Sequence, residues 1–286
     1  MNGWPGALLA ILKPVLQGYG WKIVFMIENI LQDKNVLVVD DNLINQMVVK
    51  HTLIKLGAIT DIAGDGEEAI VLFKKNKYDL VLMDIQMPLM DGYDTTRYIR
   101  NQLNSSVPII AMTAFALKGE DDKCFECGMN NYVSKPFTLE SLYNAIIKVF
   151  NSDIVINNNP NIISNSNTSV DISMLYEIAE NDEPYIKMMI TTFLENLPMV
   201  IQKIETAYAN QDWENVFRSA HYAKSSLSVI KIADIFEWIL IIETNAKKMI
   251  NLDTIPGLIE NIKTKFISVE EILNEKFSFN SKTTIA

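Results

Sequence analysis

Short apolar runs alternate with stretches of helical period over the first half of the chain. The runs are rich in β-branched residues and have the length of buried strands, whereas the stretches between them repeat apolar residues every three or four positions. This alternation is typical of βαβ units and predicts a parallel sheet with helices on both faces. Five runs fit the strand pattern: Asn35–Val39, Ala58–Ala63, Asp79–Met83, Val107–Met112 and Asn131–Ser134.

The helical stretches between and after these runs complete the pattern. The first helix is expected from Leu43 to Leu56, and the last from Leu139 to Phe150. We therefore predict a three-layer, doubly wound α/β domain over residues 35–151.

The second half of the chain has a different pattern. Residues 152–168 are dense in Asn and Ser, hold few large apolar side chains and predict a flexible linker. Beyond it, apolar residues recur at three and four positions, which predicts an all-α helical bundle over residues 169–279. Residues 280–286 are expected to form a disordered tail.

Residues 1–34 fit neither pattern. The segment is apolar, but Lys13, Pro14 and Lys22 interrupt it well short of the roughly 18 continuous apolar residues that a membrane span needs. No basic residues precede the apolar run, as a secretory signal would require. We expect a non-catalytic lead-in that is partly helical or disordered, and no membrane span.

The charge and the cysteine content of the chain argue against several classes of function. The chain has 25 basic and 35 acidic residues, a net charge of -10, and both halves are acidic. This disfavours nucleic-acid binding, which needs a cationic face. Cys124 and Cys127 have no second ligand pair or histidine near them in sequence, which argues against a zinc site or a disulfide framework and predicts a reducing cytoplasm.

Polar side chains stand where four of the predicted strands end. Asp40 and Asp41 follow the first strand, Asp84 the third, Thr113 the fourth and Lys135 the fifth. Because the carboxyl ends of parallel strands lie along one edge of the sheet, these side chains are predicted to share one pocket.

The chemistry of that pocket follows from its residue types. Clustered carboxylates repel one another unless a cation joins them, and oxygen donors without His or Cys favour Mg²⁺. A carboxylate beside Mg²⁺ can attack a phosphoryl group to give an acyl phosphate, while Lys135 and the Thr113 hydroxyl bind the phosphate oxygens.

Each of these side chains also has a purely structural interpretation. Asp41 or Asn42 could cap the following helix, Asp84 could lie in a turn, Thr113 could merely end a strand and Lys135 could be a solvated surface lysine. Their joint placement at matching strand ends outweighs these separate explanations.

The stretches VLVVDDN, LVLMDIQMPLMDG, AMTA and YVSKPF resemble the receiver domain of two-component response regulators over about residues 35–151. The resemblance implies a flavodoxin-like five-stranded parallel sheet of order 2-1-3-4-5. It further implies that Asp84 is the phosphoacceptor and that Mg²⁺ is bound by Asp40, Asp41, Asp84 and the Gln86 carbonyl. Thr113 and Lys135 would contact the phosphate, and Thr113 and Tyr132 would act as a switch pair. The resemblance also implies a cis bond between Lys135 and Pro136.

The two histidines of the chain have different surroundings. His51 lies in the first predicted helix, away from the strand ends, and is interpreted as a surface or boundary residue. His221 lies in a helix that Asp212 is expected to cap. On a helical wheel His221 points on the order of 130° away from the apolar stripe, so we expect an exposed imidazole with Arg218 and, nearer the boundary of the stripe, Lys224 beside it.

The helical half, with its motif AHYAKSS, resembles a histidine-containing phosphotransfer (HPt) domain. The resemblance implies that His221 is the phosphorylated residue and Lys224 its charge partner. Ser225 stands where that family usually has glycine.

The order receiver, linker, HPt resembles the C-terminal part of a hybrid sensor histidine kinase. The expected function is a phosphorelay intermediate that depends on Mg²⁺ and has as partners a sensor histidine kinase and the receiver domain of a response regulator. No Gly-rich nucleotide box occurs, so no ATP-binding kinase activity of its own is predicted. Two alternatives stay open: a phosphorylation-controlled binding module with a docking-only helical domain, or a truncated fragment of a hybrid kinase.

Overall fold

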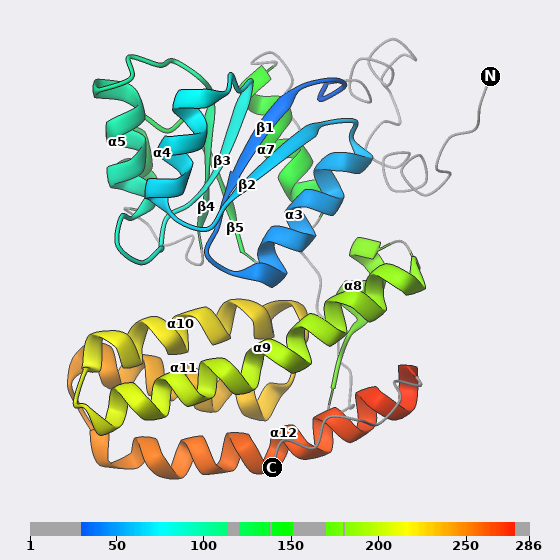
Figure 1. Ribbon diagram of the computed structural model, residues 1–286, viewed down its shortest axis with the longest axis vertical. Coiled ribbons are helices and arrows are strands. Elements are labelled where there is room, and N and C mark those ends of the chain that lie inside the picture. Colours follow the sequence, from blue (N-terminus) through cyan, green and yellow to red (C-terminus); the bar gives the residue numbers. More distant parts are fainter. Residues whose placement is uncertain are drawn as a thin grey trace. The chain divides into compact units, whose positions relative to one another are not determined.

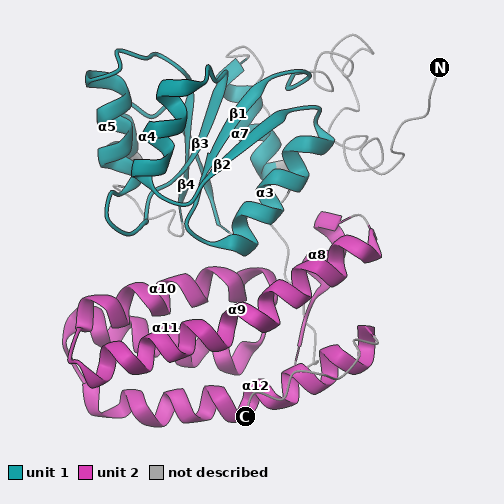
Figure 2. Ribbon diagram, in the orientation of Figure 1, with its two compact units in different colours: residues 1–161 teal, residues 162–286 magenta. Residues whose placement is uncertain are grey.

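The computed structural model describes residues 30–113, 120–135, 137, 139–150, 170–179 and 181–277. The chain forms two compact units, residues 1–161 and 162–286 (Figure 2). The predictions for most of the N-terminal lead-in, the linker, the C-terminal tail and the cis bond at Pro136 lie outside the described residues.

The first unit contains a five-stranded sheet in which every neighbouring pair of strands is parallel (Figure 1). The strand order is β2-β1-β3-β4-β5, which confirms the predicted fold. The strands are β1 (Asn35–Val39), β2 (Ile59–Ala63), β3 (Leu80–Asp84), β4 (Ile109–Thr113) and β5 (Asn131–Ser134).

Helices cover both faces of this sheet. Figure 1 shows α4 and α5 on one face and α3 and α7 on the other. The helices are α3 (Leu43–Lys55), α4 (Gly66–Lys75), α5 (Gly92–Asn101), α6 (Glu120–Glu126) and α7 (Leu139–Phe150). Strands β3 and β4 are buried along their whole length, because helices shield them on both sides.

The first helix, α3, shows how the local sequence sets the boundaries of an element. The Asn42 side chain accepts hydrogen bonds from the backbone amides of Ile44 and Asn45 and so caps the helix. The helix ends at Lys55, one residue before the predicted end, and Gly57 turns the chain with a φ of +85°.

The packed part of the first unit begins before Asn35. Leu31 is fully buried, and the Lys34 ammonium pairs with the Asp79 carboxylate at 2.9 Å. The last residues of the predicted lead-in therefore contribute to the α/β unit.

The second unit is helical, as predicted. It consists of α8 (Ser173–Ala179), α9 (Glu183–Ala209), α10 (Trp213–Val229), α11 (Ala233–Lys248), a short 3-10 turn η1 (Leu252–Thr254) and α12 (Ile255–Phe277). Helix α10 packs against both α9 and α11, and α12 packs against α9 and α11.

The apolar stripe of α10 faces the bundle core. Val216, Ala220, Ala223 and Leu227 are each at most 1% exposed. Trp213, at the start of the stripe, is only partly buried and packs edge-on against Tyr208. Asp212 caps the helix through the amide of Asn215, which confirms its predicted role.

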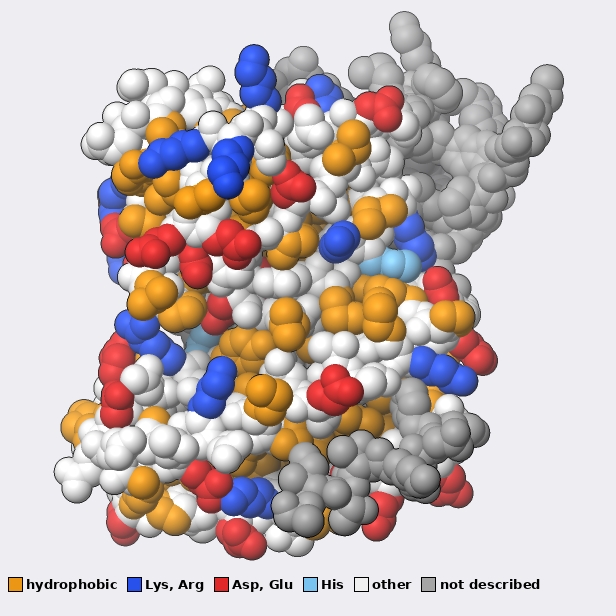
Figure 3. All heavy atoms as spheres, viewed as in Figure 1, with side chains coloured by type: hydrophobic (Ala, Val, Ile, Leu, Met, Phe, Trp, Pro, Cys, Tyr) orange, Lys and Arg blue, Asp and Glu red, His pale blue; other side chains and the backbone are white. Residues whose placement is uncertain are grey.

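The surface of the molecule mixes charges of both signs. On the face seen in Figure 3, Lys and Arg side chains lie singly or in pairs between carboxylates. Among the described residues, no helix combines the length and the apolar character needed to cross a membrane.

Candidate functional site

Asp40, directly after β1, is held in one orientation by several hydrogen bonds. Its Oδ1 accepts from the Asn42 amide at 2.9 Å and from the Asn45 side chain at 3.2 Å, while Gln46 donates to its backbone carbonyl. The side chain is fully buried. Helix α3 thus supplies the groups that orient this carboxylate, and these groups were not predicted from the sequence.

Lys135, after β5, bridges two of the acids. Its Nζ lies 2.7 Å from Asp40 Oδ2 and 2.6 Å from Asp84 Oδ2, and its side chain is only 6% exposed. Burial alone would lower the pKa of Lys135, but the two carboxylates outweigh that effect and raise it. The ammonium therefore stays charged, and the interpretation of Lys135 as a solvated surface lysine is wrong.

Asp84 ends β3 and is buried beside the same ammonium. Its Oδ1 accepts a hydrogen bond from the Gln86 amide at 3.1 Å. Burial raises its pKa to about 6; Lys135 opposes this shift and Asp40 adds to it.

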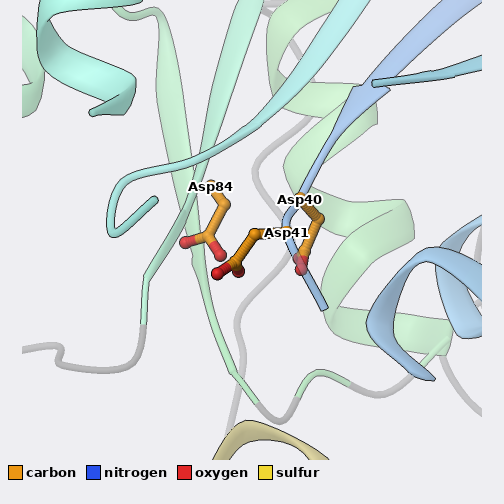
Figure 4. A group of neighbouring side chains, drawn as sticks. All are labelled: Asp40, Asp41 and Asp84. Carbon is orange, nitrogen blue, oxygen red and sulfur yellow. The ribbon is translucent and has the colours of Figure 1, made fainter. Parts of the chain in front are cut away.

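Asp41 completes a group of three carboxylates whose oxygens lie within 4.8 Å of one another. Figure 4 shows the carboxylates of Asp41 and Asp84 pointing toward one another, with Asp40 beside them. Burial and the charges of Asp40 and Asp84 raise the pKa of Asp41 well above its usual value. Of the two residues considered as caps of the following helix, Asp41 and Asn42, it is Asn42 that caps α3.

A glycine shapes the loop beside Asp84. A Cβ atom on Gly92 would lie 2.1 Å from the carbonyl oxygen of Asp84 and 2.9 Å from the Cα of Ile85. Since both contacts are with backbone, only glycine allows α5 to begin this close to the end of β3.

The remaining predicted residues of this site lie at or beside the same edge. Thr113 ends β4 and is buried, and the neighbouring strands β3 and β4 pair Asp84 with Met112. Tyr132 lies in β5, half-buried, with its ring edge-on to Phe125. The side-chain oxygen of Gln86 is buried, and no described residue hydrogen-bonds to it. The roles expected of Thr113, Tyr132 and Gln86 therefore stay predictions.

The donor set of this pocket fits a hard divalent cation. It offers three carboxylates, and the carboxylates outnumber the one ammonium that lies between them. Burial is the main cause of the raised pKa of Asp41, and the negative charges of Asp40 and Asp84 add to it. Carboxylate oxygens without sulfur or imidazole are the ligands that Mg²⁺ prefers.

In the second unit, a carboxylate that was not predicted joins the two candidate residues of α10. Glu243, on α11, lies with its Oε1 2.6 Å from His221 Nδ1, and both of its oxygens lie 2.7 Å from Lys224 Nζ. Burial would raise the pKa of Glu243, yet the hydrogen bonds from His221 and Lys224 outweigh it and lower the pKa. A carboxylate on the buried stripe of an apolar helix was the signal that could have identified it.

Two expectations for this helix are wrong. The His221 side chain is 13% exposed rather than solvent-facing, and Lys224 is buried at 9% rather than placed at the boundary. The helical wheel of α10 describes the faces of that helix alone, whereas α11 covers the flank on which both side chains lie. Arg218 was expected beside the imidazole, but it pairs with Glu214 at 2.8 Å.

The hydrogen bond to Glu243 determines what the imidazole can do. A carboxylate accepts a hydrogen bond from Nδ1–H, and in the tautomer that makes this bond Nε2 carries the free lone pair. His51, by contrast, lies half-buried on α3, in keeping with the predicted boundary position.

Each of the two units contains a match to a known protein family. Residues 36–147 match the response regulator receiver domain, and residues 188–266 match the Hpt domain. Histidine kinase 2 of Arabidopsis thaliana is 38% identical over 144 residues, and the sensor histidine kinase RcsC of Salmonella typhi is 44% identical over 110 residues. These alignments span 43% and 38% of this chain but only 12% of each of the two kinases.

A solved structure is similar to the first unit. The receiver domain of the sensor histidine kinase PA1611 from Pseudomonas aeruginosa PAO1, with a magnesium ion in its active site cleft, is 40% identical. The match covers 41% of this chain and 97% of that domain, with a TM-score of 0.39. The chain therefore carries a response regulator receiver domain followed by an Hpt domain.

Proposed function

We propose that this chain is a phosphorelay intermediate. In this proposal a histidine of a sensor kinase phosphorylates Asp84, and His221 exchanges a phosphoryl group with a receiver aspartate. The presence of a receiver domain and an Hpt domain in one chain, together with relatives named histidine kinases, supports a two-component phosphorelay role.

In the receiver domain, the Asp84 carboxylate attacks the phosphorus of a phosphohistidine. A phosphorus–oxygen bond forms, and the phosphorus–nitrogen bond breaks with its electron pair returning to the imidazole of the donor. Lys135 and Thr113 contact the transferred oxygens, and Thr113 and Tyr132 act as the switch pair. Asp40, Asp41, Asp84 and the Gln86 carbonyl would hold Mg²⁺, which would supply positive charge to offset the carboxylates and the incoming phosphoryl group.

In the Hpt domain, His221 Nε2 attacks the phosphorus of an aspartyl phosphate. A nitrogen–phosphorus bond forms, and the aspartate carboxylate leaves with the electron pair of the broken bond. The Nδ1 proton stays in the hydrogen bond to Glu243, whose negative charge offsets the positive charge that the ring gains. Glu243 therefore acts as a positioning residue for His221.

The observation that carries the proposal is the contact of 2.6 Å between His221 Nδ1 and Glu243. A helical domain that served only for docking would have no need to hold one imidazole in one tautomer against a buried carboxylate. This contact favours phosphotransfer over the docking-only alternative.

The test is incubation of the full chain with Mg²⁺ and a small acyl phosphate or a hybrid kinase, followed by separation of base-labile aspartyl phosphate from acid-labile histidyl phosphate. We expect Asp84→Asn to remove the receiver label, and His221→Gln to remove the histidyl label and keep the receiver label.

Two outcomes would contradict the proposal. Normal receiver labelling of Asp84→Asn would refute the pocket assignment, and a wild-type chain that never carries phosphate on His221 would refute the relay. His51→Gln is the matched control for the loss of an imidazole, and it should be labelled like the wild type.

A further inference from the structure

Lys224, the residue expected to balance the charge of a phosphoryl group on His221, already pairs with Glu243. Its ammonium donates to both oxygens of Glu243 at 2.7 Å, and its side chain is 9% exposed. Turning this ammonium toward a phosphoryl group would weaken a buried ion pair and leave Glu243 poorly compensated, which is costly. Lys224 therefore serves mainly to keep Glu243 ionised.

A phosphoryl group on His221 still needs a cation. It brings a charge of about -1.5 to -2 near neutral pH, and it would stand next to the ionised Glu243. A cation that is exposed and weakly held can move to such a group at low cost, whereas a buried and paired one cannot.

Lys247 has these properties. It is exposed, and its Nζ lies 5.4 Å from the ring centroid of Phe217, whose own ring centroid is 6.1 Å from that of His221. Lys247 follows Glu243 by one turn of α11, and Phe217 precedes His221 by one turn of α10. Since Glu243 contacts His221 and Lys247 contacts Phe217, the two helices run antiparallel here. Lys247 therefore lies toward the Phe217 end of α10, one turn before His221, whereas Lys224 lies on the other side of His221 along the helix.

We propose that Lys247 is the cation that binds the phosphoryl group on His221, leaving the ring of Phe217 when the group arrives. This inference rests on the proposed phosphorelay function. A cation–π contact at an exposed site is weak, so the ammonium can leave it easily. Phe217 keeps the side chain near the imidazole while His221 is unphosphorylated.

The test uses the full chain, a small acyl phosphate and Mg²⁺, and it measures the fraction of His221 that carries phosphate at equilibrium. We expect Lys247→Gln to lower the ratio of phosphorylated to unphosphorylated His221 on the order of tenfold, because one charge-assisted hydrogen bond is lost. Lys248→Gln, at the neighbouring exposed lysine, is the matched control and should leave the ratio unchanged.

A change in ionic strength provides a second measurement. A purely structural role of Lys247 would not make the phosphorylation ratio of His221 depend on salt through this residue. In the wild type, added salt should lower the ratio by screening the contact between Lys247 and the phosphoryl group, and Lys247→Gln should flatten this dependence. Equal ratios in Lys247→Gln and Lys248→Gln would overturn the inference, as would a loss seen with Arg218→Gln instead. If His221 of the wild type takes no phosphate from its own receiver domain or from any other phosphorylated receiver, the proposed function itself fails, and this inference fails with it.

Discussion

The receiver pocket and the Hpt site are built from the same ionic groups in opposite proportions. In the pocket one ammonium, Lys135, lies between two carboxylates and a third carboxylate remains beside them. In the Hpt site one carboxylate, Glu243, lies between an ammonium and an imidazole. The first arrangement has surplus negative charge, whereas in the second the carboxylate is fully compensated.

This difference in charge balance matches the difference in chemistry. In the proposed function, the surplus of carboxylates in the pocket suits a divalent cation, which would bind a phosphoryl group together with Lys135. The compensated carboxylate of the Hpt site instead holds the imidazole in one tautomer, with Nε2 as the proposed nucleophile. The proposal thus assigns an acid acceptor to one site and an imidazole acceptor to the other.

Removing Lys135, the cation that pairs with Asp40 and Asp84 in the receiver pocket, should have the largest effect on stability. Lys135→Gln takes this counter-charge from three clustered carboxylates, so we expect a loss of about 3 kcal/mol in the free energy of unfolding of the receiver domain. Urea denaturation followed by hydrogen exchange of receiver peptides measures it. Mg²⁺ should restore more stability in the variant than it adds to the wild type, because it replaces the missing charge. No loss of stability would mean that the surplus charge is compensated elsewhere.

Removing the single anion of the Hpt site should have an effect of similar or slightly smaller size. Glu243→Gln leaves the buried Lys224 without its partner, and we expect the Hpt domain to lose about 3 kcal/mol. Glu237→Gln, at an exposed position of the same helix, is the control and should change stability by less than about 0.5 kcal/mol.

A double variant tests whether that loss comes from the unpaired charge. Lys224→Met combined with Glu243→Leu removes both ions, so most of the lost stability should return while phosphotransfer through His221 stays impaired. If the double variant is as unstable as Glu243→Gln, the loss arises from packing rather than from charge.

The geometry of the pocket can be disturbed without any change of charge. Gly92→Ala places a Cβ against the backbone of Asp84 and Ile85, and we expect a loss of about 2 kcal/mol in the receiver domain together with weaker phosphorylation of Asp84. Gly257→Ala is the control, since a Cβ there meets no atom within 4 Å, and it should be neutral or stabilise α12 by about 0.5 kcal/mol. Equal responses of the two variants would contradict the close approach at Gly92.

The smallest expected effect is a pH dependence of the Hpt domain. Folding lowers the pKa of Glu243 below its value near 4.5 in the unfolded chain. The ionised Glu243 therefore contributes its full stabilisation at a pH above 4.5, and this stabilisation is lost as the pH falls through the pKa of Glu243 in the folded chain. Urea unfolding between about pH 3 and 7 measures it, with Trp213 and Trp238 as reporters after Trp4→Phe and Trp21→Phe. Glu243→Gln should lack this loss in acid, and an identical slope in both proteins would refute it.

The sequence by itself determined the fold class and most of the receiver pocket. Each strand carries its own apolar run, and parallel strands bring their carboxyl ends to one edge of the sheet, so the placement of Asp40, Asp84 and Lys135 followed from local patterns alone. The ion pair between Lys135 and Asp40 joins residues 95 positions apart, yet the topology of the sheet made it predictable.

Only the tertiary structure decided the surroundings of His221. A helical wheel describes the directions of side chains around one axis and holds no information on which neighbouring helix covers a given flank. Glu243 lies 22 residues from His221, on another helix, and its contact depends on how α10 and α11 pack. That packing partly covers the imidazole and buries Lys224 against Glu243, and it is the reason why we propose Lys247 rather than Lys224 as the cation for the phosphoryl group.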